Sequence, residues 1–137
     1  MTLSELFAYL GAPLKNPRWS WGSVRPADGA VFLRVWQDEQ RKVEGRWYTQ
    51  ISANQFFKDE PGNLGHAERQ TQVERVRNGA PSFMIMCQAS DPQAHPRSIG
   101  NYNQREVFVG GNVIRLEGDD WLARVDRRRV DKVRPSR

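Results

Sequence analysis

The sequence predicts an α+β fold in which a curled, mostly antiparallel sheet or small β-barrel carries two flanking helices. Two segments place apolar residues at helical spacing, whereas several short runs rich in β-branched and aromatic residues are bounded by turn-forming residues. Most connections between the expected strands are short, which favours hairpins and antiparallel pairing. The expected order is helix, two strands, helix and four strands.

The first expected helix begins with Thr2-Leu3-Ser4-Glu5, which fits a capping box, and ends before Gly11. Its apolar residues fall at helical spacing, which predicts a helix that packs on a core: Leu3, Leu6, Phe7 and Leu10. Residues 13–29 are rich in proline and glycine and are expected to form a loop around Trp19 and Trp21.

Two strands are expected over residues 30–36 and 46–51, joined by a polar loop of hairpin length. Alternation along the first strand places Val31, Leu33 and Val35 on one face. The opposite face then carries Phe32, Arg34 and Trp36. Residues 54–65 are expected to be irregular.

A second helix is expected over residues 66–77, with a thin apolar stripe of Ala67, Val73 and Val76. Residues 81–89 form the most apolar run and are expected to be a central strand, in which Cys87 is a small core residue. Residues 91–104 are expected to be a loop.

The last strands are expected at residues 105–109, 112–117 and 121–125. Gly110-Gly111 is interpreted as a two-residue hairpin between the first two of them. Residues 1–125 are therefore expected to form a single α+β domain, followed by a basic C-terminal tail at residues 126–137.

The net charge of +5 is concentrated at the C-terminus. Residues 124–137 hold seven basic and two acidic side chains, and the remaining residues are neutral overall. Such a tail is either a solubilising end or a phosphate-contacting arm. In the second case the contacting residues are expected to be Arg127, Arg128, Arg129 and Lys132.

Composition argues against several classes. One cysteine and two histidines make a zinc centre improbable, no cofactor or nucleophile motif is present, and no run approaches the ~20 apolar residues of a membrane span. The chain start does not resemble a secretory signal, so a cytoplasmic location is the default expectation. Loop carboxylates could assemble a magnesium site, but solvated carboxylates are the ordinary case, so a small hydrolase or nuclease is the least favoured class.

The distinctive feature is aromatic. Of five tryptophans, Trp19, Trp21 and Trp36 stand among polar or basic residues, and Arg34 lies on the Trp36 face of its strand. Arg46 and Tyr48 would extend this face if they lie across the hairpin. The result would be a patch of rings and guanidinium groups suited to a nucleobase. The alternative is that the tryptophans are core residues and Arg34 pairs with Asp38 or Glu39.

The run Phe32-Leu33-Arg34-Val35-Trp36, the arginine-rich helix around Glu68 to Arg77, the buried strand to Ala89 and Gly110-Gly111 together resemble small PUA/EVE-like domains. That resemblance implies a curled β-barrel with flanking helices and an aromatic pocket for a modified or flipped base. It implies Trp19, Trp21, Arg34 and Trp36 as pocket residues, with Asn101, Tyr102 and Asn103 as rim contacts.

The leading hypothesis is therefore a non-catalytic binding module for a nucleobase, nucleotide or nucleic acid, with no cofactor. The alternative is a protein-interaction or homodimerisation module that uses the same aromatic residues as interface anchors.

Overall fold

The computed structural model describes residues 1–135 of the 137-residue chain. Within these residues, the α-helices α1, α2 and α3 and the 3-10 helix η1 span Leu3–Tyr9, Asn54–Phe57, Leu64–Arg77 and Val130–Lys132. The strands β1 to β8 span Gly22–Val24, Val31–Trp36, Gln40–Val43, Arg46–Ser52, Ser82–Ala89, Ile99–Tyr102, Glu106–Leu116 and Asp119–Arg129. None of the helices in this part of the chain is both long and apolar enough to cross a membrane.

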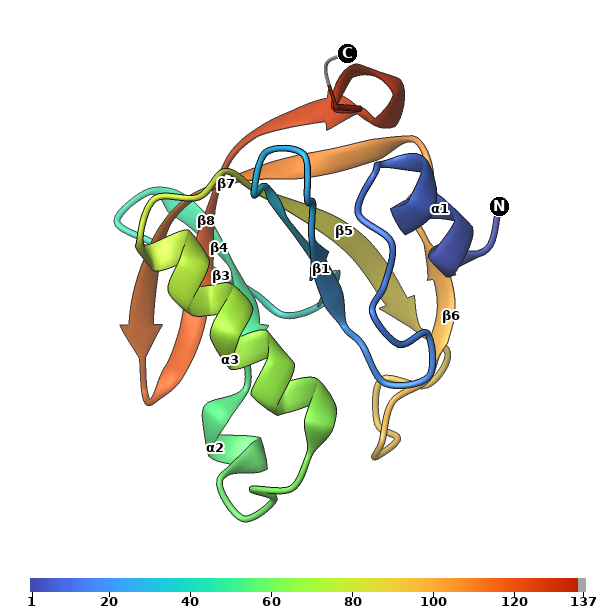
Figure 1. The fold of residues 1–137 in the computed structure, drawn as a ribbon. Helices are drawn as coiled ribbons and strands as arrows, with labels where there is room; N and C mark the ends of the chain where they lie inside the picture. Colours follow the sequence, from blue (N-terminus) through green and yellow to red (C-terminus); the bar gives the residue numbers. More distant parts are fainter. Residues whose placement is uncertain (136–137) are drawn as a thin grey trace.

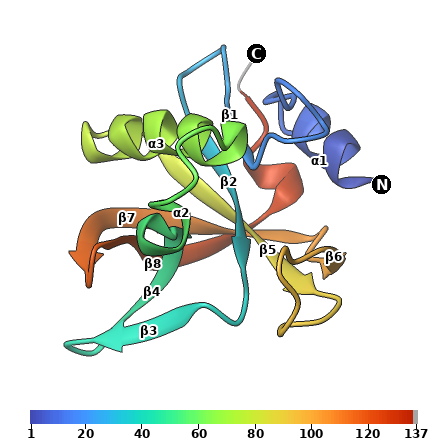
Figure 2. The same cartoon turned by 90° about the horizontal axis from the view of Figure 1, so that it is seen from below.

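The strands form one curled, mostly antiparallel sheet that does not close into a barrel (Figures 1 and 2). Its order is β1-β2-β5-β7-β8-β4-β3, and β6 pairs with β5 beside this path. Neighbouring β2 and β5 run parallel, whereas the other described pairs are antiparallel. The predicted α+β class and curled sheet are confirmed.

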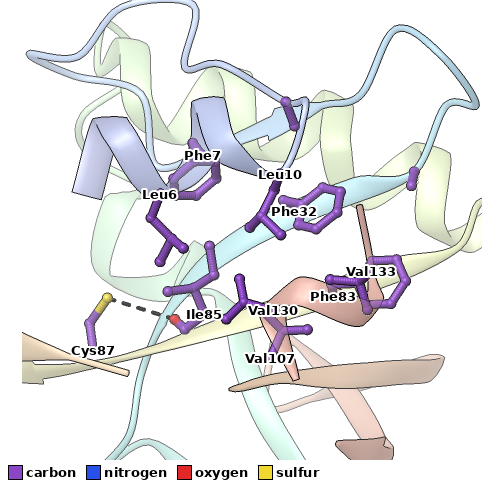
Figure 3. Packing of buried hydrophobic residues seen from close by; sticks show 12 residues of the cluster. Leu6, Phe7, Leu10, Phe32, Phe83, Ile85, Cys87, Val107, Val130 and Val133 are labelled. Carbon is purple, nitrogen blue, oxygen red and sulfur yellow. Dashed lines mark hydrogen bonds between the residues drawn. The ribbon is translucent and has the colours of Figure 1, made fainter. Parts of the chain in front are cut away.

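Two hydrophobic clusters pack on opposite faces of β2 and β5, and α1 and α3 flank these strands (Figure 2). Alternation along β2 assigns its residues as expected, because Val31, Leu33 and Val35 join the cluster with α3. Phe32 enters the other cluster, where it lies beside Phe7 and Leu10 of α1 (Figure 3). Cys87 is buried in that cluster too, as predicted, and burial raises the pKa of its thiol to about 11.

The first helix begins as predicted, since Thr2 and Glu5 form a reciprocal capping box. Short elements appear in three segments expected to be irregular, namely β1, α2 and β6. On α3 the predicted stripe is partly wrong. Ala67 is exposed, and the polar residues Arg69 and Gln72 lie on the buried face beside Val73 and Val76.

The predicted hairpin between residues 36 and 46 is also different in the structure. Residues 40–43 form the edge strand β3, which pairs with β4 through a turn at Glu44 and Gly45, both with positive φ. β4 pairs on its other side with β8 rather than with β2. Polar residues are favoured at a sheet edge because charged side chains there discourage pairing with another chain, so the local pattern resembled a loop.

Gly110-Gly111 does not form a hairpin turn and lies inside the long strand β7. A Cβ atom at Gly110 would lie 2.2 Å from Ser82 Oγ, and one at Gly111 would lie 2.7 Å from Val125 Cγ1. The pairing of β7 with β8 shifts register here, so the glycines permit close packing at an irregularity. The turn lies at Glu117 and Gly118, which both have positive φ.

The C-terminal segment is largely part of the fold. The boundary expected after residue 125 falls within β8, which pairs with β7 as far as Arg129. Val130 and Val133 then enter the cluster with α1 (Figure 3). The buried Arg25 donates from Nη1 to the carbonyl oxygens of Val133 at 2.6 Å and Leu10 at 2.9 Å. Of the expected tail, residues 136 and 137 lie outside the described part of the chain.

Candidate functional site

A small pocket of about 100 Å³ lies where β2, β4, α2 and α3 meet. Its volume is well below the roughly 300–1,000 Å³ of sites that hold drug-sized ligands, so it suits a single ring or a comparably small group. Its lining combines aromatic, basic and neutral polar residues: Trp21, Arg34, Val35, Trp36, Gln50, Ile51, Ser52, Ala53, Phe57 and Arg69.

Arg69 of α3 connects the segments that build the pocket. Its Nη2 donates to the backbone carbonyl oxygens of Trp21 at 2.7 Å and of Arg34 at 2.8 Å, and its Nη1 donates to that of Ile51. One buried guanidinium therefore holds the segment before β1, the strand β2 and the strand β4 in a fixed arrangement. Burial, with a smaller contribution from the charge of Arg34, lowers the pKa of Arg69 to about 9.

The aromatic wall is formed by Trp21 and Phe57, whose ring centroids lie 5.2 Å apart. Phe57 in turn stacks on His66, with centroids 5.1 Å apart and planes inclined by 24°. Trp21 also rests on Gly65 of α3, where a Cβ atom would lie 2.4 Å from Trp21 Cε2. Glycine at this position lets the helix backbone approach the indole ring.

Arg34 is the unpaired cation of the pocket. Its side chain is half-buried, and within residues 1–135 it makes no ion pair or side-chain hydrogen bond. Burial lowers the pKa of its guanidinium, so the charged form is less well solvated than in water. A guanidinium offers five N–H donors in a planar fork, and these donors are available to a ligand.

The alternative pairing of Arg34 with Asp38 or Glu39 is not present. Arg97 occupies both carboxylates, with two hydrogen bonds to Asp38 at 2.8 and 2.9 Å and an ion pair to Glu39 at 3.5 Å. The same guanidinium lies over the ring of Trp36, with Cζ 5.3 Å from the centroid. Arg97 therefore neutralises the acidic turn after β2 and supports Trp36 from outside the pocket.

A polar network supports the pocket from the side of α2. Asn54 Oδ1 accepts hydrogen bonds from Ser52 Oγ at 2.8 Å and Gln70 Nε2 at 2.7 Å, and it lies 3.0 Å from His66 Nε2. Asn54 Nδ2 donates to the fully buried Asp120 at 2.8 Å. These bonds fix the orientation of Ser52, the hydroxyl residue of the pocket lining.

The structure brings three of the predicted ligand-binding residues together, namely Trp21, Arg34 and Trp36. Trp19 is partly exposed but does not line the pocket. Tyr48 is buried with Trp121 and Ala123, and Arg46 lies in a separate groove near β8. This separation follows from strand order, because β4 pairs with β8 and not with β2.

The other predicted contacts also lie away from the pocket. Asn101 and Tyr102 belong to β6, where the Tyr102 hydroxyl donates to the Met1 carbonyl oxygen, and Asn103 follows that strand. Arg127, Arg128 and Arg129 are exposed on β8, and Lys132 is exposed in η1. Each of these arginines lies within 4.0 Å of an acidic residue, Arg129 at 2.8 Å from Asp131.

Sequence reasoning missed Phe57 and Arg69. Phe57 lies in a segment without clear periodicity, and Arg69 lay on a helix where a charged residue is expected to be solvated. The one local signal was the cluster of arginines on that helix, which does not reveal which of them is buried.

Two guanidinium groups thus border a pocket whose remaining walls are aromatic rings, an amide and a hydroxyl. Stacking surfaces and hydrogen-bond donors together suit a flat ligand with acceptor atoms at its edge. Among residues 1–135 no group of three or more histidine, cysteine or acidic side chains is placed to hold a metal ion. No protein-family model, curated protein or solved structure matches this chain.

Proposed function

We propose that this protein is a non-catalytic binding module whose pocket holds a nucleobase, either free, in a nucleotide or in a nucleic acid. The observation that carries the proposal is Arg34, a half-buried cation beside aromatic rings that has no partner among the residues described. A partly desolvated charge is costly unless it is paired, so a ligand that supplies an acceptor would relieve this cost.

The pocket lining supports the same class of ligand. Trp21, Trp36 and Phe57 offer ring surface for stacking, and Arg34, Gln50 and Ser52 offer polar groups to the edge of a base. The proposal agrees with the resemblance to PUA/EVE-like domains, which itself stays a proposal.

Tryptophan fluorescence tests it, because Trp21 and Trp36 line the pocket. The wild-type protein is titrated with the nucleoside 5′-monophosphates and with single-stranded and duplex oligonucleotides, plain and base-modified, at low and physiological salt. We expect saturable quenching by at least one probe that persists at physiological salt. Arg34→Gln should abolish this response while the protein remains folded.

Gly65→Ala is a second variant that acts on the pocket through Trp21, since the added methyl group must displace the indole. Gly62→Ala is its matched control, because an added Cβ there meets no atom within 4 Å. Loss of quenching in Gly65→Ala but not in Gly62→Ala would place the ligand at Trp21. Equal affinity in wild type and Arg34→Gln would exclude the pocket as the binding site.

A second candidate function is protein interaction or homodimerisation. Phe56 and Leu64, at 54% and 58% exposure, stand beside the pocket on α2 and at the start of α3. Exposed large apolar residues are typical interface anchors. A molecular mass that rises with protein concentration, and that Phe56→Ala lowers, would favour this function over ligand binding.

A further inference from the structure

A second basic and aromatic surface lies away from the pocket, along the C-terminal half of β8 and the turn between β3 and β4. It is an open groove of about 630 Å³, here called the β8 groove. Its lining residues are Gly45, Arg46, Trp47, Phe108, Arg124, Asp126 and Arg127.

Arg124 stands at the centre of this groove. Its Cζ lies 5.6 Å from the ring centroid of Trp47 and 5.5 Å from that of Phe108, so the guanidinium contacts two aromatic rings. No hydrogen bond or ion pair to Arg124 is found in the described chain, and its Nε is buried without a partner. The side chain is therefore held in place by the rings while its donors stay available.

Trp47 is an exposed aromatic surface on the same side. Its side chain is 44% exposed, although tryptophan is highly buried on average. Lys42 Nζ lies 5.9 Å from its centroid, so a second cation stands next to the ring. An indole ring that is fixed by neighbouring cations and open to solvent is a stacking platform.

The charges of the groove have one sign. Arg46, Arg124 and Arg127 line it against a single carboxylate, that of Asp126, which lies 3.7 Å from Arg128. Arg46 makes one long contact to Asn112 at 3.4 Å, and Arg127 is 3.8 Å from Glu106. None of these contacts is a close ion pair, so the groove presents a net positive surface.

We infer that the β8 groove binds the sugar-phosphate backbone of a single-stranded nucleic acid, with one base stacked on Trp47. Cationic side chains that follow a backbone, combined with an exposed ring, are the features of sequence-tolerant single-strand binding. A paired duplex keeps its bases stacked inside and offers none to Trp47. The inference shares its class of ligand with the proposed function and rests on it to that extent, but it concerns a different surface.

Fluorescence anisotropy of a labelled 12-nucleotide deoxythymidine strand, and of an abasic strand of equal length, tests this inference. Both strands are titrated at several salt concentrations. We expect the Arg46→Gln/Arg127→Gln double variant to weaken both strands and to reduce the salt slope by about two, because each lost phosphate contact lowers it by about one. The charge-matched control is Arg75→Gln, an exposed arginine on α3 outside the groove.

Trp47→Ala separates stacking from charge. It should weaken the deoxythymidine strand about tenfold, as expected for loss of one stacked base, and leave the abasic strand unchanged. Arg124→Gln should weaken both strands. The double variant carries two exposed substitutions and keeps the test valid if Arg124→Gln perturbs the packing of Trp47.

Three results would overturn the inference. The first is an equal loss of affinity in the groove variants and in Arg75→Gln, which would indicate diffuse charge attraction. The second is tighter binding of a duplex than of the single strand. The third is concentration-dependent dimerisation that Trp47→Ala abolishes, which would assign the groove to a second copy of the chain.

The two proposals fail separately. Arg34→Gln should leave binding of the abasic strand at the groove intact, and the groove variants should leave the quenching by mononucleotides intact. Loss of only one response would therefore identify which surface was assigned incorrectly.

Discussion

Arg34 and Arg69 border the same pocket but differ in what surrounds each guanidinium. Arg69 is buried and donates to three backbone carbonyl oxygens, whereas Arg34 is half-buried and has no such partner in residues 1–135. A buried charge with satisfied donors holds structure together, while an unpaired one costs stability that a ligand can recover. The first arginine therefore has a structural role, and the second is available for binding.

Substitution should reveal this difference in stability. Arg69→Met leaves three buried carbonyl groups without a donor and should lower the free energy of unfolding by roughly 3 kcal/mol. Arg34→Gln removes a partly desolvated charge and should leave that free energy unchanged or slightly higher. Urea denaturation of both variants measures the effect. A loss in Arg34→Gln as large as that in Arg69→Met would mean that Arg34 has a structural partner.

His66 should make stability depend on pH. Burial, with the charge of Arg69, lowers the pKa of its imidazole in the folded protein below the value of about 6.5 in the unfolded chain. Above pH 6.5 both states are neutral and the stability is complete. As pH falls below that value the unfolded chain takes up the proton first, so the free energy of unfolding decreases.

Urea denaturation at pH 7.5, 6.5 and 5.5 measures this dependence. His66→Gln should flatten the profile between these values. His95→Gln keeps His66 and should retain the slope that His66 causes. Identical profiles in the wild type and His66→Gln would contradict the expectation.

At the scale of elements, the C-terminal segment belongs to the core. η1 contributes Val130, and Val133 follows it into the cluster formed with α1. Val130→Ala removes two buried methyl groups and should lower the free energy of unfolding by about 2 kcal/mol. Val125→Ala makes the same chemical change on β8 at a side chain that is 53% exposed. It should change stability by less than about 0.5 kcal/mol.

Thermal and urea denaturation compare the two variants. Equal stability in Val130→Ala and Val125→Ala would show that this segment does not pack as described. Removing residues 126–137 as a supposed tail would delete paired strand and core, so charge-neutralising substitutions are the better test of phosphate contact.

At the scale of the whole molecule, Asp120 joins the two halves of the chain. Its fully buried carboxylate on β8 accepts hydrogen bonds from Arg77 of α3, Arg115 of β7 and Asn54 of α2. The pocket support and the sheet are thus connected through one side chain. A carboxylate with several donors is the arrangement in which removing the charge costs most.

Asp120→Asn should lower the free energy of unfolding by about 3 kcal/mol or more, because buried donors lose their charged acceptor. Arg115→Gln breaks the partner whose side chain is 57% exposed and should cost less than about 1 kcal/mol. Urea denaturation of the two variants and their double variant gives the coupling energy. A loss in Asp120→Asn no larger than in Arg115→Gln would contradict the central role of this carboxylate.

Local sequence patterns were sufficient for the elements whose residues carry a period or a cap. The capping box placed the start of α1, alternation placed β2, and the apolar run placed β5. Arg34 could also be identified from sequence, since a charged residue on a strand face beside aromatic residues requires a partner, solvent or a ligand.

Pairing between distant segments decided the rest. Whether β4 lies beside β2 or β8 places Tyr48 in the core and Arg46 in the β8 groove, and no local period distinguishes the two arrangements. Gly110-Gly111 has the composition of a turn, but contacts with Ser82 and Val125 make it part of a strand. Arg69 and Phe57 enter the pocket because α2 and α3 fold back onto β2 and β4. These positions depend on contacts between residues far apart in the chain, and such contacts leave no signature in the neighbouring sequence.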